Sequence, residues 1–249
     1  MIRLYILFFL LHITMNIKMF VCFHKKIFPD IYEISSTENE KYITFYGVKD
    51  RISGIENVIY EDELVHYNDV LQKNRYNEGS CIYHVYKNNL CDFDYVGFCQ
   101  YDMMFPNWFF SNIEYKISKN PNTIFYMDFF KWAFLGGQTT ITHDYCNVTA
   151  GLKSYNEFFN KNYTTENLLT NKMNTCNTFL IPKKMYEKMM SWLIQYFRDD
   201  ITINTCVNGH RFDPGHMIEA LTGMFLSLEI SEGAVYEKLN LSHDHNFKI

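Results

Sequence analysis

The stretch FDYVGFC (residues 93–99), followed directly by Gln100-Tyr101-Asp102, decides the fold that this sequence predicts. A short apolar run bounded by polar residues is typical of a buried strand. Buried strands of this kind occur in parallel sheets, where ligands bind beyond the carboxyl ends of the strands. We therefore expect Gln100-Tyr101-Asp102 to lie at a ligand site.

On both sides of this stretch, the sequence alternates between apolar runs and helical patterns. Strands are predicted at residues 18–23, 42–48, 60–64, 124–128 and 176–181. Helices are predicted at residues 81–88 with Ser80 as N-cap, 107–118, part of 144–162, 182–198 and 215–228. This alternation predicts an α/β fold with a mainly parallel central sheet and helices on both faces. The polar tail from residue 232 is expected to be mobile.

Length and composition favour one domain over residues 15–249. The chain has 249 residues, of which 47% are hydrophobic, and no linker rich in Pro, Gly or Ser divides it. The net charge of −5 and the pI near 6.0 argue against nucleic acid as a partner. The seven cysteines include no C-x-x-C pair, so we expect neither a zinc site nor a disulfide framework. Such cysteine usage indicates a reducing compartment, the cytoplasm.

Residues 1–14 have two interpretations. Residues 4–11 are apolar and follow Arg3, like the core of a signal peptide, but no small-residue cleavage site follows them. The run is also shorter than the roughly 20 residues that span a bilayer. Either the segment is a signal or anchor, which would bring membrane contact or a secretory route, or it is an extension upstream of Met15.

Asp102 is the first candidate for chemistry. A carboxylate just beyond a buried strand can hold a divalent ion, and that ion can neutralise a departing nucleoside diphosphate. Gln100 would be a weaker, neutral ligand. The alternative is that Asp102 only caps the following turn.

The late helix carries a second candidate group. His216, Glu219 and Gly223 are spaced to share one face, opposite Ile218 and Leu221. A carboxylate and an imidazole on one helix face can serve acid–base chemistry. A polar face of this kind can equally be merely solvated.

Other residues with functional potential are aromatic or histidine side chains. Trp132 with Gly136-Gly137 could form an aromatic platform for a ligand ring, although a single Trp in an apolar run also suits a core. His243 and His245 are spaced like a pair of metal ligands in the tail.

The stretch NEGSCIYHVYKNNLCDFDYVGFCQYDMMF (residues 77–105) resembles the core signature of the capsular-polysaccharide glycosyltransferases, a family with a GT-A-like fold. In that family, a helix "Y-W-x-W-K-N" precedes a strand "D-Y-I-G-x-x-H-Y-R-R-Y-F". Similar segments follow the family order at FVCFHK (residues 20–25), NTFLIP (residues 177–182) and HMIEAL (residues 216–221). The matches extend over most of the chain, from about residue 18 to residue 228.

The resemblance implies transfer of a sugar from a nucleotide-sugar donor, a UDP-sugar first among them, to a glycan acceptor. It implies Mn²⁺ or Mg²⁺ as cofactor, with Asp102 as metal ligand and catalytic residue and Glu219 as the base that activates the acceptor hydroxyl. Donor binding would then involve His24, Glu78, Gln100, Tyr101, Asn177 and His216. Alternatively, His24 is an ordinary residue at a strand end and Glu78 only stabilises the start of the following helix.

Two departures from the family pattern fall in the tripeptide itself. The family histidine is Gln100 here, and its first arginine is Asp102. Together with the composition, they suggest a divergent, viral subgroup in which Asp102 restores a metal-binding carboxylate. Alternatively, they mark a loss of activity that leaves a nucleotide- or glycan-binding module of the same fold.

Overall fold

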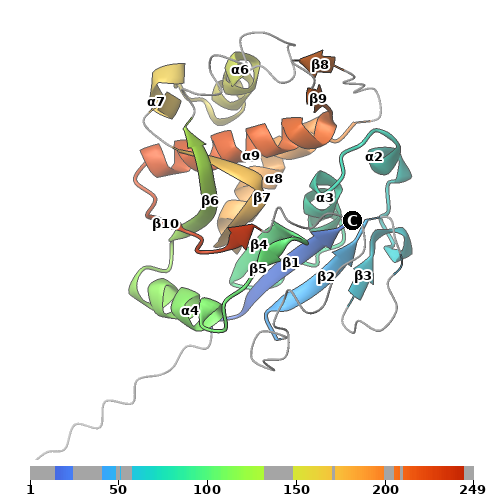
Figure 1. Cartoon of the computed structure of the whole chain (residues 1–249). Coiled ribbons are helices and arrows are strands. Elements are labelled where there is room, and N and C mark those ends of the chain that lie inside the picture. Colours follow the sequence, from blue (N-terminus) through green and yellow to red (C-terminus); the bar gives the residue numbers. More distant parts are fainter. Residues whose placement is uncertain are drawn as a thin grey trace, which may run out of the picture.

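The computed structural model describes residues 15–24, 41–48, 51, 58–131, 148–169, 172–198, 205–207 and 210–243. These residues form an α/β fold around one central sheet (Figure 1). Across the sheet the order is β10 (Tyr236–Lys238), β6 (Ile124–Lys131), β7 (Lys172–Pro182), β4 (Tyr95–Gln100), β1 (Ile17–Phe23), β2 (Ile43–Gly47) and β3 (Val58–Tyr60). β7 runs antiparallel to β4 and β6, and the other pairs are parallel. The mainly parallel sheet is therefore confirmed.

Both faces of the sheet are buried. Alternate residues of β1 belong to different apolar clusters, with Phe20 and Cys22 in one and Met19 and Val21 in the other. The first cluster includes residues of α3 (Gly79–Lys87), α8 (Lys183–Leu193) and α9 (Pro214–Ser231). The second includes α4 (Phe109–Lys119). Helices on both faces are thus confirmed, as Figure 1 shows.

The remaining elements are short or lie at the periphery. They are α2 (Asp69–Lys73), α6 (Val148–Phe159), α7 (Thr165–Leu169), the 3-10 helices Glu61–Glu63 and Ile194–Tyr196, and two small two-stranded sheets. β8 (Thr205–Val207) pairs with β9 (His210–Phe212), and β5 (Met103–Met104) pairs with β11 (Ser242–His243).

Gly97 in β4 occupies a position where the sheet leaves no room for a side chain. A Cβ atom there would lie 2.8 Å from Sδ of Met19 and 2.9 Å from the backbone oxygen of Phe179. The close packing against β1 and β7 explains why the central strand carries a glycine.

Three predictions about local structure were wrong. The segment 60–64 forms the end of β3 and a 3-10 helix, because Glu61 turns inward and accepts a hydrogen bond from Ser80. Ser80 therefore lies inside α3, and Glu78 occupies the N-cap position. The tail beyond residue 232 is not a loose end, since β10 adds a parallel strand to the sheet and β11 pairs with β5.

The predicted helix at 182–198 is shorter in the structure. α8 begins at Lys183 and ends at Leu193, and a 3-10 turn follows it. Four of the cysteines, Cys22, Cys81, Cys91 and Cys99, are buried free thiols. Burial raises the pKa of each of these thiols, as expected for cysteines that pack as small hydrophobes.

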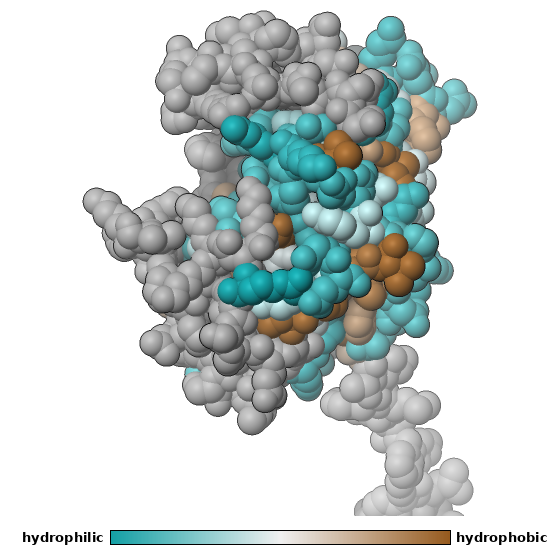
Figure 2. All heavy atoms as spheres, turned by 90° about the vertical axis from the view of Figure 1, so that its right-hand side faces the viewer, coloured by the Kyte–Doolittle hydropathy of each residue, from teal (hydrophilic) through white to brown (hydrophobic). Residues whose placement is uncertain are grey.

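Within the described ranges, no helix combines the length and the apolar character needed to cross a bilayer. The face on the side of α2 and β3 is mostly hydrophilic, with hydrophobic residues in small separate groups (Figure 2).

Candidate functional site

The candidate site lies where β1 and β4 leave the sheet. These strands are parallel neighbours, and Cys22 pairs with Gln100, so His24 and Tyr101 emerge at the same edge. Their rings meet edge to face, with centroids 5.3 Å apart and an interplanar angle of 89°. The topology therefore brings together two predicted site residues that are far apart in sequence, at the edge where parallel sheets bind ligands.

Glu78 reaches the same edge from a tight turn before α3. Arg75 and Asn77 in this turn have positive φ angles of 65° and 48°. The turn presents the Glu78 carboxylate to β1, where its Oε1 lies 2.9 Å from Nδ1 of His24. Strained backbone at a sheet edge is typical of functional loops, although it also serves to pack one element closely on another.

The start of α9 packs against this turn. The amide of Gly215 donates to the Arg75 carbonyl at 3.2 Å. A Cβ atom on Gly215 would lie only 2.9 Å from the Tyr76 oxygen, so this contact requires glycine. Nδ2 of Asn77 lies 3.5 Å from Oδ2 of Asp213 and adds a long polar contact. α9 is thereby held with its first turns beside Glu78.

Asp213 and His216 form a pair in the first turn of α9. Asp213 is the N-cap, and its Oδ1 accepts from the His216 amide and lies 2.9 Å from His216 Nδ1. The bond from Asp213 raises the pKa of His216. Burial acts to raise the pKa of Asp213, but the bonds from His216 outweigh it and lower that pKa.

Glu219 lies one turn further along α9 and points to β7. Its Oε1 accepts a hydrogen bond of 2.7 Å from the backbone amide of Cys176. Burial raises the pKa of Glu219, against the lowering effects of the Cys176 amide and His216, and the Glu78 charge raises it further. A carboxyl group with a raised pKa suits a general base.

The bond from Cys176 is possible because β7 is irregular here. Cys176 and Asn177 both have positive φ angles, 58° and 46°. Asn177 is buried, and its Oδ1 has no hydrogen-bond partner in the part of the chain that the structure describes. A buried amide oxygen without a partner is costly in a finished fold and is common where a ligand completes the site.

Glu78 acts both on the residues at the strand ends and on those at the start of α9. Burial raises the pKa of the Tyr101 hydroxyl, and the charges of Asp102 and Glu78 raise it further. The same Glu78 charge also acts on Glu219. The structure thus brings His24, Glu78 and Tyr101 together, with Asp102 beside Tyr101, and places His216 and Glu219 on the adjoining helix.

The remaining predicted residues differ in their position. Gln100 is the last residue of β4, directly before Tyr101, and is partly exposed at the same edge. Gly223 does not share an exposed face with His216; it is buried like Ile218, because β7, α3, α6, α7 and α8 surround α9. Trp132, Gly136-Gly137 and His245 lie outside the described residues, and His243 belongs to β11.

Asp213 was not among the predicted site residues, although the sequence carries a signal for it. An Asp followed by Pro214 at the start of an apolar helix is a typical N-cap with proline at the first helical position. The role of Cys176 as an amide donor had no such signal.

A divalent ion would find few protein ligands at this edge. Within the described ranges, no three His, Cys, Asp or Glu side chains are grouped so that they could hold a metal ion. Asp102, whose Oδ1 is buried, could supply one carboxylate. Mg²⁺ is commonly held by one or two carboxylates together with substrate phosphates, so Asp102 fits an ion that is shared with a phosphate-bearing ligand.

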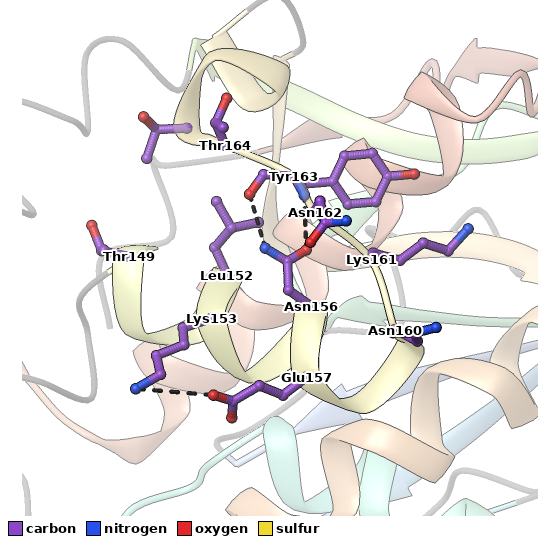
Figure 3. A pocket seen from close by; sticks show the side chains of 11 residues that line it. Thr149, Leu152, Lys153, Asn156, Glu157, Asn160, Lys161, Asn162, Tyr163 and Thr164 are labelled. Atoms are coloured by element: carbon purple, nitrogen blue, oxygen red, sulfur yellow. Dashed lines mark hydrogen bonds and ion pairs between the residues drawn. The ribbon is translucent and has the colours of Figure 1, made fainter.

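A pocket of about 590 Å³ lies on another part of the molecule, against α6. Figure 3 shows that Asn156 of α6 points to Tyr163, whose backbone amide and carbonyl it bonds. Lys153 and Glu157 pair along the helix at 3.9 Å. The pocket shares no residue with the site at the ends of β1 and β4.

The sheet order and the placement of α9 define a GT-A-like α/β fold. Among solved structures, the chain is similar to the bifunctional glycosyltransferase WbbM, with a TM-score of 0.63, 17% identity and 93% of this chain covered. The chain spans only 46% of the WbbM chain. A match to the mannosyltransferase Ktr4p from S. cerevisiae has a TM-score of 0.39 and 13% identity, covering 92% of this chain and 70% of that one. No family model and no curated protein matches the sequence.

Proposed function

We propose that this protein transfers a sugar from a nucleotide-sugar donor, a UDP-sugar first among them, to the hydroxyl of a glycan acceptor. The observation that carries the proposal is the convergence of His24, Glu78 and Tyr101 at the carboxyl edge of β1 and β4. This edge binds ligands in open α/β sheets, and the fold is similar to that of a glycosyltransferase.

In the proposed reaction, Glu219 is the base that takes the proton from the acceptor hydroxyl. Burial raises the pKa of Glu219, which makes it a stronger base, and the Cys176 amide fixes one of its oxygens. His216 would contact the diphosphate, and the bond from Asp213 raises its pKa and so favours the charged imidazolium form.

The donor would lie against His24, Glu78, Gln100, Tyr101 and Asn177. The buried Oδ1 of Asn177 would accept a hydrogen bond from a donor hydroxyl or base N–H group. Asp102 would hold Mn²⁺ or Mg²⁺ together with diphosphate oxygens. When bound, the ion would supply positive charge that stabilises the leaving diphosphate. This charge is needed because the edge is acidic and carries Glu78, Asp102, Asp213 and Glu219.

The test compares donor binding with donor turnover. Binding of UDP and UDP-sugars is measured by calorimetry with and without Mn²⁺, and UDP release is followed with a panel of acceptors. We expect Asp102→Asn to weaken the Mn²⁺-dependent binding, while Glu219→Gln still binds donor but loses about 10²- to 10⁴-fold in turnover. Glu157→Gln, at an exposed position of α6, is the matched control and should change neither quantity.

Absence of both binding and turnover for every nucleotide sugar, with or without Mn²⁺, would refute the proposal. Binding without turnover in the wild-type protein would instead identify a degenerate binding module.

A further inference from the structure

Two histidines of the candidate site are held in the same way. Nδ1 of His24 lies 2.9 Å from Oε1 of Glu78, and Nδ1 of His216 lies 2.9 Å from Oδ1 of Asp213. In both rings the carboxylate contacts Nδ1, so Nε2 lies on the other side of the ring, away from the carboxylate. A carboxylate that contacts one ring nitrogen in this way fixes the orientation and the tautomer of the imidazole. We call these contacts the two histidine–carboxylate pairs.

A single tight turn holds both histidine–carboxylate pairs. Glu78 of this turn contacts His24, and Nδ2 of the preceding Asn77 lies 3.5 Å from Oδ2 of Asp213. Asn77 has a positive φ angle of 48°, a conformation that belongs to the sharp bend of the turn. Because consecutive Cα atoms are only about 3.8 Å apart, the two pairs are neighbours, although one comes from the end of β1 and the other from the start of α9.

The imidazoles are more accessible than the carboxylates that hold them. The His24 side chain is 24% exposed and the His216 side chain is 50% exposed, whereas Glu78 and Asp213 are only 13% and 11% exposed. A ligand that approaches from solvent therefore meets the two rings before it meets the two carboxylates.

The charge of His216 depends on pH. The bond from Asp213 raises the pKa of His216, burial lowers it in part, and the charges of Glu219 and Glu78 raise it further. An imidazolium can donate a charge-assisted hydrogen bond to an anion, and it also offsets the negative charge of the carboxylate behind it. When the ring loses its proton, the charge of Asp213 is left unopposed and repels an anion. The two states of His216 should therefore differ in their affinity for an anionic ligand.

We propose that His24 and His216 together bind the diphosphate of a nucleotide-sugar donor through their Nε2–H groups, and that donor affinity falls as the pH rises. Glu78 and Asp213 then act as positioning residues that orient the two rings. Because binding favours the charged ring, affinity is highest below the raised pKa of His216 and declines as the pH rises through it. This inference rests on the proposed function, since it takes the nucleotide-sugar donor as the ligand.

The experiment measures binding of three donors to the full chain by calorimetry, between about pH 6 and about pH 8.5, with and without Mg²⁺. The donors are UDP-glucose, UDP-galactose and UDP-N-acetylglucosamine. Both phosphates of these donors are diesters and keep a constant charge over this range, so a pH effect comes from the protein. Each titration is repeated in two buffers that differ in ionisation enthalpy, which gives the number of protons taken up on binding.

The test variants are His216→Gln, Asp213→Asn and His24→Gln. Asp213→Asn removes the negative charge but keeps a side-chain oxygen, and asparagine is as good an N-cap as aspartate, so α9 should remain intact. The control is His66→Gln, which removes an exposed histidine that precedes α2.

We expect the wild-type protein and the His66 variant to bind donor at least about tenfold more weakly near pH 8.5 than near pH 6, which is the usual contribution of one hydrogen bond to a charged group. Both should take up protons on binding as the pH rises. His216→Gln should lose the pH dependence and the proton uptake. In Asp213→Asn the decline in affinity should move to lower pH. His24→Gln should bind about tenfold more weakly at every pH and keep the pH dependence, because His216 remains.

Three results would overturn this inference and leave the proposed sugar transfer intact. The first is donor binding with the same pH dependence and proton uptake in the wild-type protein and in His216→Gln. The second is donor binding that His24→Gln leaves unchanged, and the third is a decline in affinity at the same pH in Asp213→Asn as in the wild type. If none of the three donors bound at any pH, with or without Mg²⁺, the proposed transfer from a UDP-sugar would be refuted as well.

Discussion

Glu219 of α9 and Cys176 of β7 are joined by a hydrogen bond of 2.7 Å between a carboxylate oxygen and a backbone amide. The two residues are 43 positions apart in sequence. The bond has two effects, since it satisfies a backbone donor at an irregular point of β7 and fixes the orientation of the carboxylate. Stability and chemistry can therefore be separated by choosing the substitution.

We predict that Glu219→Ala lowers the free energy of unfolding by about 1–3 kcal/mol, because the Cys176 amide loses its acceptor in a partly buried place. Glu219→Gln keeps an oxygen that can accept this bond and should lose well under half of that amount. Urea denaturation of the three proteins measures the difference. Equal stabilities for the Ala and Gln variants would show that the bond contributes nothing.

The Asp213–His216 pair predicts a pH dependence of stability. The pKa of His216 is raised, so its contribution is present below its ordinary value of about 6.5 and is lost as the pH rises through the raised pKa. The pKa of Asp213 is lowered, so its contribution is present above its ordinary range and is lost as the pH falls through the lowered pKa.

We therefore expect the wild-type protein to have a higher free energy of unfolding than His216→Gln. This difference should be largest near pH 5.5 and smaller at pH 8.5. The effect should stay below about 1 kcal/mol, because half of the His216 side chain is exposed and solvent screens the pair. Denaturation series at several pH values provide the measurement. A stability difference that does not change between pH 5.5 and pH 8.5 would exclude the titrating pair.

The sequence predicted the core strands because their signals are local. The apolar runs that became β1, β2 and β4 are continuous in sequence, and each is buried on both faces. The edge where His24 and Tyr101 emerge followed from the parallel arrangement alone. The tail could not be predicted in this way, since β10 becomes a strand only by pairing with β6, more than 100 residues earlier.

The role of Ser80 was misjudged for a related reason. Its sequence context fits an N-cap. In the structure, however, the Ser80 hydroxyl is buried and donates a hydrogen bond of 2.8 Å to the buried carboxylate of Glu61. Gln72 also donates to Ser80, at 2.6 Å. A buried carboxylate is stable only with hydrogen-bond donors beside it. Because Glu61 and Ser80 are 19 positions apart, the local sequence pattern does not indicate their contact.

This buried group yields a third prediction. Ser80→Ala removes a donor from Glu61, which is only 2% exposed, and should cost about 1–3 kcal/mol in the free energy of unfolding. Ser191→Ala is a matched control, because the Ser191 hydroxyl bonds a carbonyl within its own exposed helix surface, and its loss should cost less than about 0.5 kcal/mol. Similar losses in the two variants would contradict the buried role of Ser80.

The last prediction concerns two glycines with different surroundings. In Gly97→Ala, the added methyl group would meet the backbone oxygen of Phe179 at 2.9 Å, and backbone in the middle of a sheet cannot move away. We expect Gly97→Ala to lower the free energy of unfolding by about 1–3 kcal/mol. At Gly79, the first residue of α3, a methyl group would lie 3.4 Å from Ile218 side-chain atoms, an ordinary contact. Gly79→Ala should therefore leave stability unchanged or raise it by up to about 1 kcal/mol, because alanine restricts the unfolded chain. Thermal and urea unfolding of both variants tests the pair. If Gly97→Ala were as stable as Gly79→Ala, β4 would not be packed between β1 and β7 as closely as the register of these strands requires.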